Sequence, residues 1–152
     1  MKSRCLFAAL MLFALPVLAD ESSVVGYWRT IDDVTGKPKA VIRITESQDH
    51  TLRGQILKIF PRPGFDQNEV CVQCEGDKHN QRIVGMTVMN HLKPDADNQN
   101  LYTKGTILDP NNGKTYHCNV LLTQNGQQLE VRGYLGIPLF GRSQTWLRVN
   151  SA

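Results

Sequence analysis

Cys71 and Cys74 form a C-x-x-C pair, which is the pattern in this chain with the greatest chemical potential. Such a pair can be a redox-active dithiol, half of a zinc site or a disulfide. A redox dithiol needs its first cysteine at a helix N-terminus, where the thiol pKa is lowered. Here the pair lies in a polar segment with Glu69, Glu75 and Asp77 nearby, and these acidic neighbours raise a thiol pKa. The sequence therefore argues against redox catalysis.

A metal site is the second interpretation of this pair. It would recruit Cys71, Cys74 and His79, with Cys118 or His117 as a fourth ligand. A second C-x-x-C or an H-x-x-x-H pattern is missing, so we expect no metal. We predict instead a structural disulfide that holds a long loop, either Cys71–Cys74 or one of these paired with Cys118. Cys118 alternates with apolar residues, which indicates a small buried side chain.

The remaining polar residues do not form a recognisable catalytic set. None of the four histidines lies in a nucleophile motif such as G-x-S-x-G; they are His50, His79, His91 and His117. The best carboxylate candidates are Asp32, Asp33, Asp109 and Glu130. Three of these aspartates precede turns, where aspartate commonly bonds its own backbone. No glycine-rich phosphate loop is present either. We predict a protein that is not an enzyme, with no catalytic residues and no cofactor.

The first nineteen residues have the pattern of an export signal. Lys2 and Arg4 precede an apolar run over Leu6–Leu15, and Val17-Leu18-Ala19 has the small residues of a cleavage site. The apolar run is too short to span a bilayer, and no longer one follows it. We expect residues 1–19 to be a signal peptide cut near Ala19. The domain at 20–152 is then periplasmic or secreted, where disulfides form.

Charge excludes one class of partner. Lys2 and Arg4 are two of the 17 basic residues, so 15 remain against 14 acidic ones and the net charge falls from +3 to +1. No basic patch with interleaved aromatic residues remains, so nucleic-acid binding is not expected.

Short segments of period-two alternation follow the leader and predict β-strands. All 12 glycines lie after residue 19, whereas alanine occurs there only three times, so a helical bundle is disfavoured. The expected strands are Val24–Arg29, Lys39–Glu46, Leu52–Phe60, Ile83–Leu92, Leu101–Asp109, Thr115–Thr123, Gln127–Leu135 and Ser143–Val149. Hairpin turns separate most of them, and one long loop at 61–82 does not fit a simple turn. We predict an all-β, antiparallel barrel of roughly eight strands.

Two motifs at opposite ends of the domain carry a family resemblance. Gly26-Tyr27-Trp28 opens the first strand, and Thr145-Trp146-Leu147-Arg148-Val149 forms the last. This arrangement resembles the lipocalin (calycin) pattern, in which the tryptophan plugs one barrel end and the arginine stacks across it. The resemblance assigns Gly26, Trp28 and Arg148 to a structural barrel-end motif.

Longer segments are similar to an uncharacterised family of short secreted bacterial proteins. The similar segments are Gly26–Asp33, Cys71–Cys74, Ile107–Tyr116 and Arg132–Trp146. The resemblance covers nearly all of residues 20–152 and implies a lipocalin-like fold and an exported location. It carries over no catalytic residues.

A barrel of this size holds one small ligand or is filled by its own side chains. We expect a small hydrophobic or amphipathic ligand, such as a fatty acid. The expected lining is Ile42, Ile44, Ile56, Met86, Val88, Val120, Leu122 and Val131, with Phe65 as a lid over the mouth. The alternatives are an envelope interaction module with a filled barrel, or a metal or redox site at Cys71 and Cys74. The oligomeric state is left open.

The segment from Gly133 to Gly141 is apolar and contains Pro138, so it cannot be a central strand there. We expect a tight connection packed against the barrel end. The alternative is an exposed apolar hairpin that contacts a partner or an envelope surface.

Overall fold

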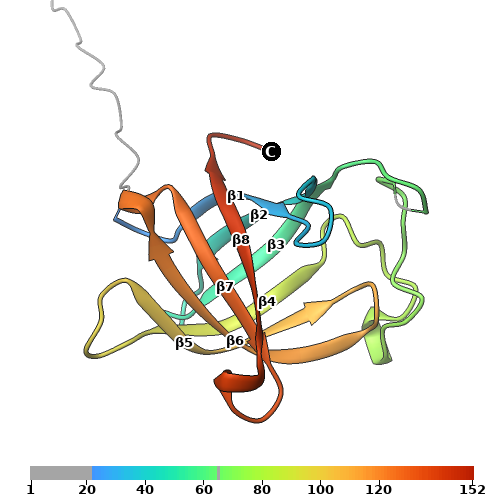
Figure 1. The fold of residues 1–152 in the computed structure, drawn as a ribbon. Helices are drawn as coiled ribbons and strands as arrows, with labels where there is room; N and C mark the ends of the chain where they lie inside the picture. Colours follow the sequence, from blue (N-terminus) through green and yellow to red (C-terminus); the bar gives the residue numbers. More distant parts are fainter. Residues whose placement is uncertain (1–21, 65) are drawn as a thin grey trace, which may run out of the picture.

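The computed structural model describes residues 22–64 and 66–152, which form a closed eight-stranded antiparallel barrel (Figure 1). Each strand pairs with the next, and β8 pairs with β1. The strands are β1 Gly26–Ile31, β2 Pro38–Glu46, β3 Leu52–Ile59, β4 Thr87–Pro94, β5 Leu101–Asp109, β6 Lys114–Thr123, β7 Gln128–Tyr134 and β8 Arg142–Val149. The predicted fold class is confirmed.

Three short 3-10 helices lie in the connections: η1 Gly76–Lys78, η2 Gln124–Gly126 and η3 Pro138–Phe140. In the part of the chain that the structure describes, no helix is long and apolar enough to cross a membrane. The expected signal peptide at 1–19 and the expected lid residue Phe65 lie outside the described residues.

Alternation in the sequence explains most strand bounds. On β6, Cys118 and Val120 are buried while His117 is exposed, as expected for successive side chains on opposite faces. The predicted start of the fourth strand at Ile83 is wrong, because β4 begins at Thr87. The intervening Gly85 has a φ of +95° and donates its N–H to the Ile56 carbonyl. This conformation turns the chain before the sheet ladder begins.

The connections fall into two groups, one at each end of the barrel. The mouth end carries the β1–β2, β3–β4, β5–β6 and β7–β8 connections. The closed end carries the β2–β3, β4–β5 and β6–β7 connections and the segment that leads into β1. The β3–β4 connection is the longest and extends to one side of the barrel (Figure 1).

The closed end is sealed by the predicted motif. Trp28 is fully buried, and its indole N–H donates to the Val24 carbonyl at 2.8 Å. Gly26 has a φ of +140°, and a Cβ added there would lie 2.9 Å from Nη1 of Arg148. Glycine therefore leaves room for the arginine to reach across the end of the barrel.

The interior is continuous from the closed end into the long loop. The buried side chains from the strands pack together with Cys71, Cys74, Ile83 and Met86 of the β3–β4 connection. This connection is therefore part of the core rather than a free loop. An isolated bridge between Val70 and Arg82 closes its base.

The predicted packing of the β7–β8 connection against the barrel end is wrong. Leu139 and Phe140 have exposed fractions of 75% and 80%, and Leu135 and Ile137 have fractions of 60% and 54%. The connection projects beyond the strands at the lower edge of Figure 1. Arg132 holds its backbone, so the apolar side chains do not fold back on the barrel.

Candidate ligand cavity at the mouth of the barrel

The mouth half of the barrel contains a cavity of about 260 Å³. Its apolar wall comes from strands on all sides and from the long connection: Ala40, Ile42, Ile56, Ile83, Val88, Ile107, Leu108, Val131 and Trp146. The volume lies just below the range of roughly 300–1,000 Å³ that is usual for ligand pockets. It exceeds a cavity of about 150 Å³ that holds benzene in another protein. The space therefore suits one compact molecule or one acyl chain.

Half of the predicted lining residues lie at this cavity. Ile42, Ile56, Val88 and Val131 are among its wall residues. Ile44, Met86, Val120 and Leu122 are buried but do not line it. These four belong to the packed part of the interior, so the barrel is filled in one part and hollow in another.

Apart from the candidate carboxylate Asp109, the sequence did not single out the polar rim of the cavity. The rim and neighbouring wall include Lys39, Arg62, Arg142, Asp109, Thr30, Asn111, Asn112, Tyr116 and Gln144. Tyr116 could have been found from the sequence, because alternation on β6 places it on the same face as Cys118 and Val120. The rim residues from connections have no comparable periodic signal.

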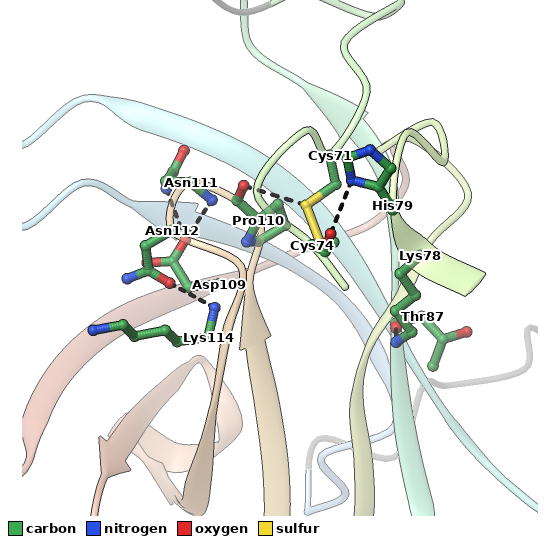
Figure 2. Close-up of a disulfide and its surroundings, with 10 residues drawn as sticks. All are labelled: Cys71, Cys74, Lys78, His79, Thr87, Asp109, Pro110, Asn111, Asn112 and Lys114. Atoms are coloured by element: carbon green, nitrogen blue, oxygen red, sulfur yellow. Dashed lines mark hydrogen bonds between the residues drawn. A yellow bond between two sulfur atoms is a disulfide. The ribbon is translucent and has the colours of Figure 1, made fainter. Parts of the chain in front are cut away.

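Basic side chains outnumber acidic ones around the cavity. Lys39, Arg62 and Arg142 line it together with a single acidic residue, Asp109. The Asp109 carboxylate accepts hydrogen bonds from the backbone N–H and the side-chain amide of Asn111 (Figure 2). Both bonds lie within the β5–β6 turn. Arg142 forms an ion pair with Asp33. The local field at the mouth therefore favours an anionic or strongly polar group.

A disulfide joins Cys71 and Cys74, with an S–S distance of 2.01 Å (Figure 2). Of the pairings expected from the sequence, this is the one within the C-x-x-C pair, and Cys118 is not part of it. The Cys71 sulfur lies 3.4 Å from the Pro110 carbonyl oxygen in the β5–β6 turn. This contact is not a hydrogen bond, because a disulfide sulfur carries no proton. The disulfide thus lies beside residues that line the cavity.

The backbone of the disulfide segment packs directly on the β5–β6 turn. Gly113 has a φ of +70°, and a Cβ added there would lie 1.8 Å from the Gln73 carbonyl oxygen. No side chain fits at this position without separating the two segments. On the other side of the segment, the Lys78 ammonium donates to the Thr87 carbonyl at 2.9 Å. The long connection is therefore anchored between the β5–β6 turn and β4.

The described residues do not bring a set of metal ligands together at the C-x-x-C pair. Both sulfurs of the C-x-x-C pair are in the disulfide, and Cys71 is fully buried. The His79 ring nitrogen Nδ1 lies 3.0 Å from the Cys74 carbonyl oxygen. Among residues 22–64 and 66–152, no group of three or more His, Cys, Asp or Glu side chains is placed to hold a metal ion.

Cys118 is a buried free thiol. Burial raises its pKa from 9.0 to about 12, because the thiolate would lose its hydration. At neutral pH the side chain is therefore a neutral, unreactive thiol. His117, the residue before Cys118, points to the outer face, where its ring centre lies 5.5 Å from that of Tyr134.

The candidate carboxylates are engaged within turns or in contacts with β8. Asp32 accepts hydrogen bonds from the backbone N–H groups of Val34 and Thr35 and from the Thr35 hydroxyl. The bonds from Thr35 lower the Asp32 pKa below its ordinary value of 3.8. Asp33 is engaged with Arg142, and Glu130 accepts a hydrogen bond from the Ser143 hydroxyl. The four histidines are exposed and lie on separate segments.

The barrel is similar to a solved structure reported as "Protein HP1028 from the human pathogen Helicobacter pylori belongs to the lipocalin family". The TM-score is 0.70, the sequences are 18% identical, and the match covers 84% of each chain. At this identity the likeness shows the fold alone. No curated protein matches the chain significantly.

The sequence itself matches a family model over most of the barrel. Residues 26–148 match the model described as "Uncharacterized protein conserved in bacteria (DUF2147)". This range runs from Gly26 at the closed end, through the disulfide segment, to Arg148 on β8. The chain therefore belongs to the DUF2147 family of bacterial proteins, and its fold is a lipocalin-like barrel.

Proposed function

We propose that this protein binds one small hydrophobic or amphipathic molecule in the mouth half of its barrel. The observation that carries the proposal is the cavity of about 260 Å³ with an apolar wall and a rim rich in basic side chains. A barrel that served only as a scaffold would gain stability by filling this space, because an apolar void loses packing contacts.

The apolar wall sets the driving force for binding. A ligand that buries about 250 Å² of apolar surface gains about 6 kcal/mol from its removal from water. The cavity is too small for a lipid with two acyl chains, so the ligand is a single-chain amphiphile or a compact ring system.

The rim sets the chemistry of the exposed end of the ligand. Lys39 on β2, Arg62 in the long connection and Arg142 on β8 all line the cavity. A carboxylate placed among them gains charge-assisted hydrogen bonds. Fatty acids combine such a head with a single apolar chain, so we assign the ligand to this class.

Binding rather than catalysis fits the state of the polar groups. Asp32 and Asp109 accept hydrogen bonds within their own turns, and the Cys118 thiol is buried. A general base or nucleophile needs an accessible side chain within reach of the ligand.

The location of the protein is part of the proposal. Residues 1–19 have the pattern of a signal peptide, and the Cys71–Cys74 disulfide favours an oxidising compartment. N-terminal sequencing of the protein from fractionated host cells tests this point. A mature N-terminus near Asp20 in the periplasm or medium supports export, whereas an intact Met1 in the cytoplasm contradicts it.

The binding proposal is tested by filling the cavity. Val131 is 3% exposed and lines the cavity, so Val131→Phe places a ring in the free space. Val34→Phe is the matched control, because Val34 is 81% exposed and does not line the cavity. Calorimetric titration with dodecanoic acid should give one site for the native protein and Val34→Phe. Binding to Val131→Phe should fall by about tenfold or more.

Two results would contradict the proposal. One is the absence of measurable binding of dodecanoic acid, dodecanol and a compact aromatic probe to the native protein. The other is equal binding to the native protein and Val131→Phe, which would place the ligand outside the cavity. Circular dichroism of both variants checks that the barrel remains folded.

A further inference from the structure

The β7–β8 connection displays four large apolar side chains to solvent. Leu135, Ile137, Leu139 and Phe140 are each more than half exposed, and Phe140 reaches 80%. We call residues 135–140 the apolar tip. Clusters of large apolar side chains exposed to solvent lower solubility. In folded proteins such clusters mark surfaces that contact a membrane or another molecule.

The backbone of the apolar tip is held in place. The Arg132 guanidinium donates from Nε to the Pro138 carbonyl at 2.7 Å and from Nη2 to the Leu139 carbonyl at 3.2 Å. Its Nη1 donates to the Ser143 hydroxyl at 2.9 Å. Gly141 lies so close to Gly133 that an added Cβ would be 2.7 Å from the Gly133 carbonyl oxygen. The tip is therefore preorganised with its apolar side chains pointing outward, which lowers the entropy cost of docking.

Basic side chains around the tip outnumber acidic ones by one. Between Val131 and Gln144 the chain carries two arginines, Arg132 and Arg142, and no acidic residue. Arg142 is paired with Asp33, and Arg132 donates to the Ser143 hydroxyl, which in turn donates to the Glu130 carboxylate. Leu135 also shares a hollow with Lys78 and Lys114 against one acidic residue, Glu75. The surroundings of the tip are thus basic in balance.

We propose that the apolar tip docks the barrel, mouth first, on a lipid bilayer surface that carries anionic headgroups. Interfacial binding to such a bilayer grows with the apolar area that enters the lipid and with the attraction of basic side chains to anionic headgroups. A stable protein–protein interface needs about 800 Å² from each partner, which six residues at the end of one hairpin do not supply. This difference in size favours a lipid surface over a second copy of the chain.

Docking in this orientation brings the cavity to the membrane. Gly133 and Arg142, at the two ends of the connection, both line the cavity. A molecule that leaves the bilayer would therefore enter the barrel without crossing bulk water. This consequence rests on the proposed ligand binding, whereas the docking itself does not.

The test uses protein that begins at Asp20, because the expected leader would itself partition into lipid and all eight strands lie within residues 26–149. Trp28 and Trp146 are buried, with exposed fractions of 0% and 1%, so a tryptophan placed at the tip is a selective probe. Phe140→Trp is compared with Val25→Trp, a position at the closed end that is 41% exposed. Both are mixed with phosphatidylcholine vesicles with and without phosphatidylglycerol.

The expected result is a blue shift of Phe140→Trp emission and its quenching by brominated acyl chains, on vesicles that contain phosphatidylglycerol. Val25→Trp should show neither change. The double substitution Leu139→Ser/Phe140→Ser should reduce vesicle binding about tenfold or more. The same double variant should bind dodecanoic acid as the native protein does, which separates docking from cavity binding.

Three results would overturn docking. The first is Phe140→Trp emission that stays unchanged with vesicles of either composition. The second is vesicle binding that is the same for the native protein and the double variant. The third is lipid-free dimerisation in sedimentation experiments that the double substitution abolishes, which would identify a second copy of the chain as the occupant. Equal binding to both vesicle types would overturn the assignment to anionic lipid.

Discussion

The guanidinium carbon of Arg148 lies 4.3 Å from the ring centre of Trp28, at directly paired positions of β8 and β1. The same guanidinium donates from Nε to the Gly126 carbonyl and from Nη2 to the Ser23 carbonyl, both at 2.5 Å. One side chain therefore joins the segment before β1, the β6–β7 connection and the indole. This arrangement closes the end of the barrel opposite the mouth.

Loss of this closure should destabilise the barrel. We expect Arg148→Met to lower the free energy of unfolding by about 2–4 kcal/mol, because it removes a cation–π contact and several charge-assisted hydrogen bonds. Arg148→Lys should recover little of the loss, because an ammonium cannot reproduce the planar fork. Denaturant unfolding measures both effects.

Arg43→Met is the matched control for this experiment. Arg43 on β2 lies over Tyr27 on β1 at 5.6 Å, on the exposed outer face of the barrel, so its loss should cost about 0.5 kcal/mol or less. Equal stability of Arg148→Lys and the native protein would contradict the role assigned to the guanidinium.

Cys118 should be inert in the folded protein. With a pKa of about 12, only about one thiol in ten thousand is ionised at pH 8, and the side chain is fully buried. Protein that begins at Asp20 should release one equivalent of thiol to Ellman's reagent in denaturant and almost none in native buffer. Rapid stoichiometric modification of the folded protein would show that Cys118 is accessible.

Asp32 should make stability depend on pH in the acid range. Its folded-state pKa is lowered, chiefly by the hydrogen bonds from Thr35, so its contribution is fully present above the unfolded pKa. The contribution is lost as the pH falls through the lowered folded value. The stability advantage of the native protein over Asp32→Asn should therefore be constant above pH of about 5 and shrink as the pH falls below 3.8.

Asp97→Asn provides the comparison for this pH series. Asp97 is exposed and its carboxylate accepts no hydrogen bond among the described residues, so this variant controls for the loss of one surface carboxylate. Unfolding midpoints measured in denaturant between pH 2 and 7 give both profiles. Parallel curves for the native protein and Asp32→Asn would contradict the prediction.

Lys39 should discriminate between ligand head groups. It lines the cavity, whereas Lys37 in the β1–β2 turn does not. We expect Lys39→Met to weaken dodecanoic acid binding by about tenfold, which is about 1.4 kcal/mol for a charge-assisted contact, and to leave dodecanol binding unchanged. Lys37→Met should bind both as the native protein does. Equal losses for acid and alcohol in Lys39→Met would indicate a packing effect instead.

Most of the barrel could be predicted because strand signals are local. Alternation on β6 and β7 fixes which side chains face inward, and the Asp109–Gly113 turn separates β5 from β6 as expected. The start of β4 was missed because Ile83 and Met86 continue an apolar pattern, although they belong to the long connection. Periodicity does not distinguish a strand from a buried segment beside it.

The cavity could be predicted only in part, because alternation gives direction but not depth. Ile42 and Ile44 both face inward on β2, but only Ile42 lines the cavity. Where side chains stop filling the barrel depends on residues from all strands at one level, which no local pattern encodes. The exposure of Leu139 and Phe140 was likewise missed, because the hydrogen bonds from Arg132 that hold the tip outward join separate segments.

The central claim is that the barrel holds a bound small molecule. Native mass spectrometry of protein purified from its own bacterial host tests this claim most directly. The account predicts one additional small-molecule mass per chain, absent from Val131→Phe purified in the same way. A bare polypeptide that also fails to take up dodecanoic acid, dodecanol or an aromatic probe when these are added would contradict it.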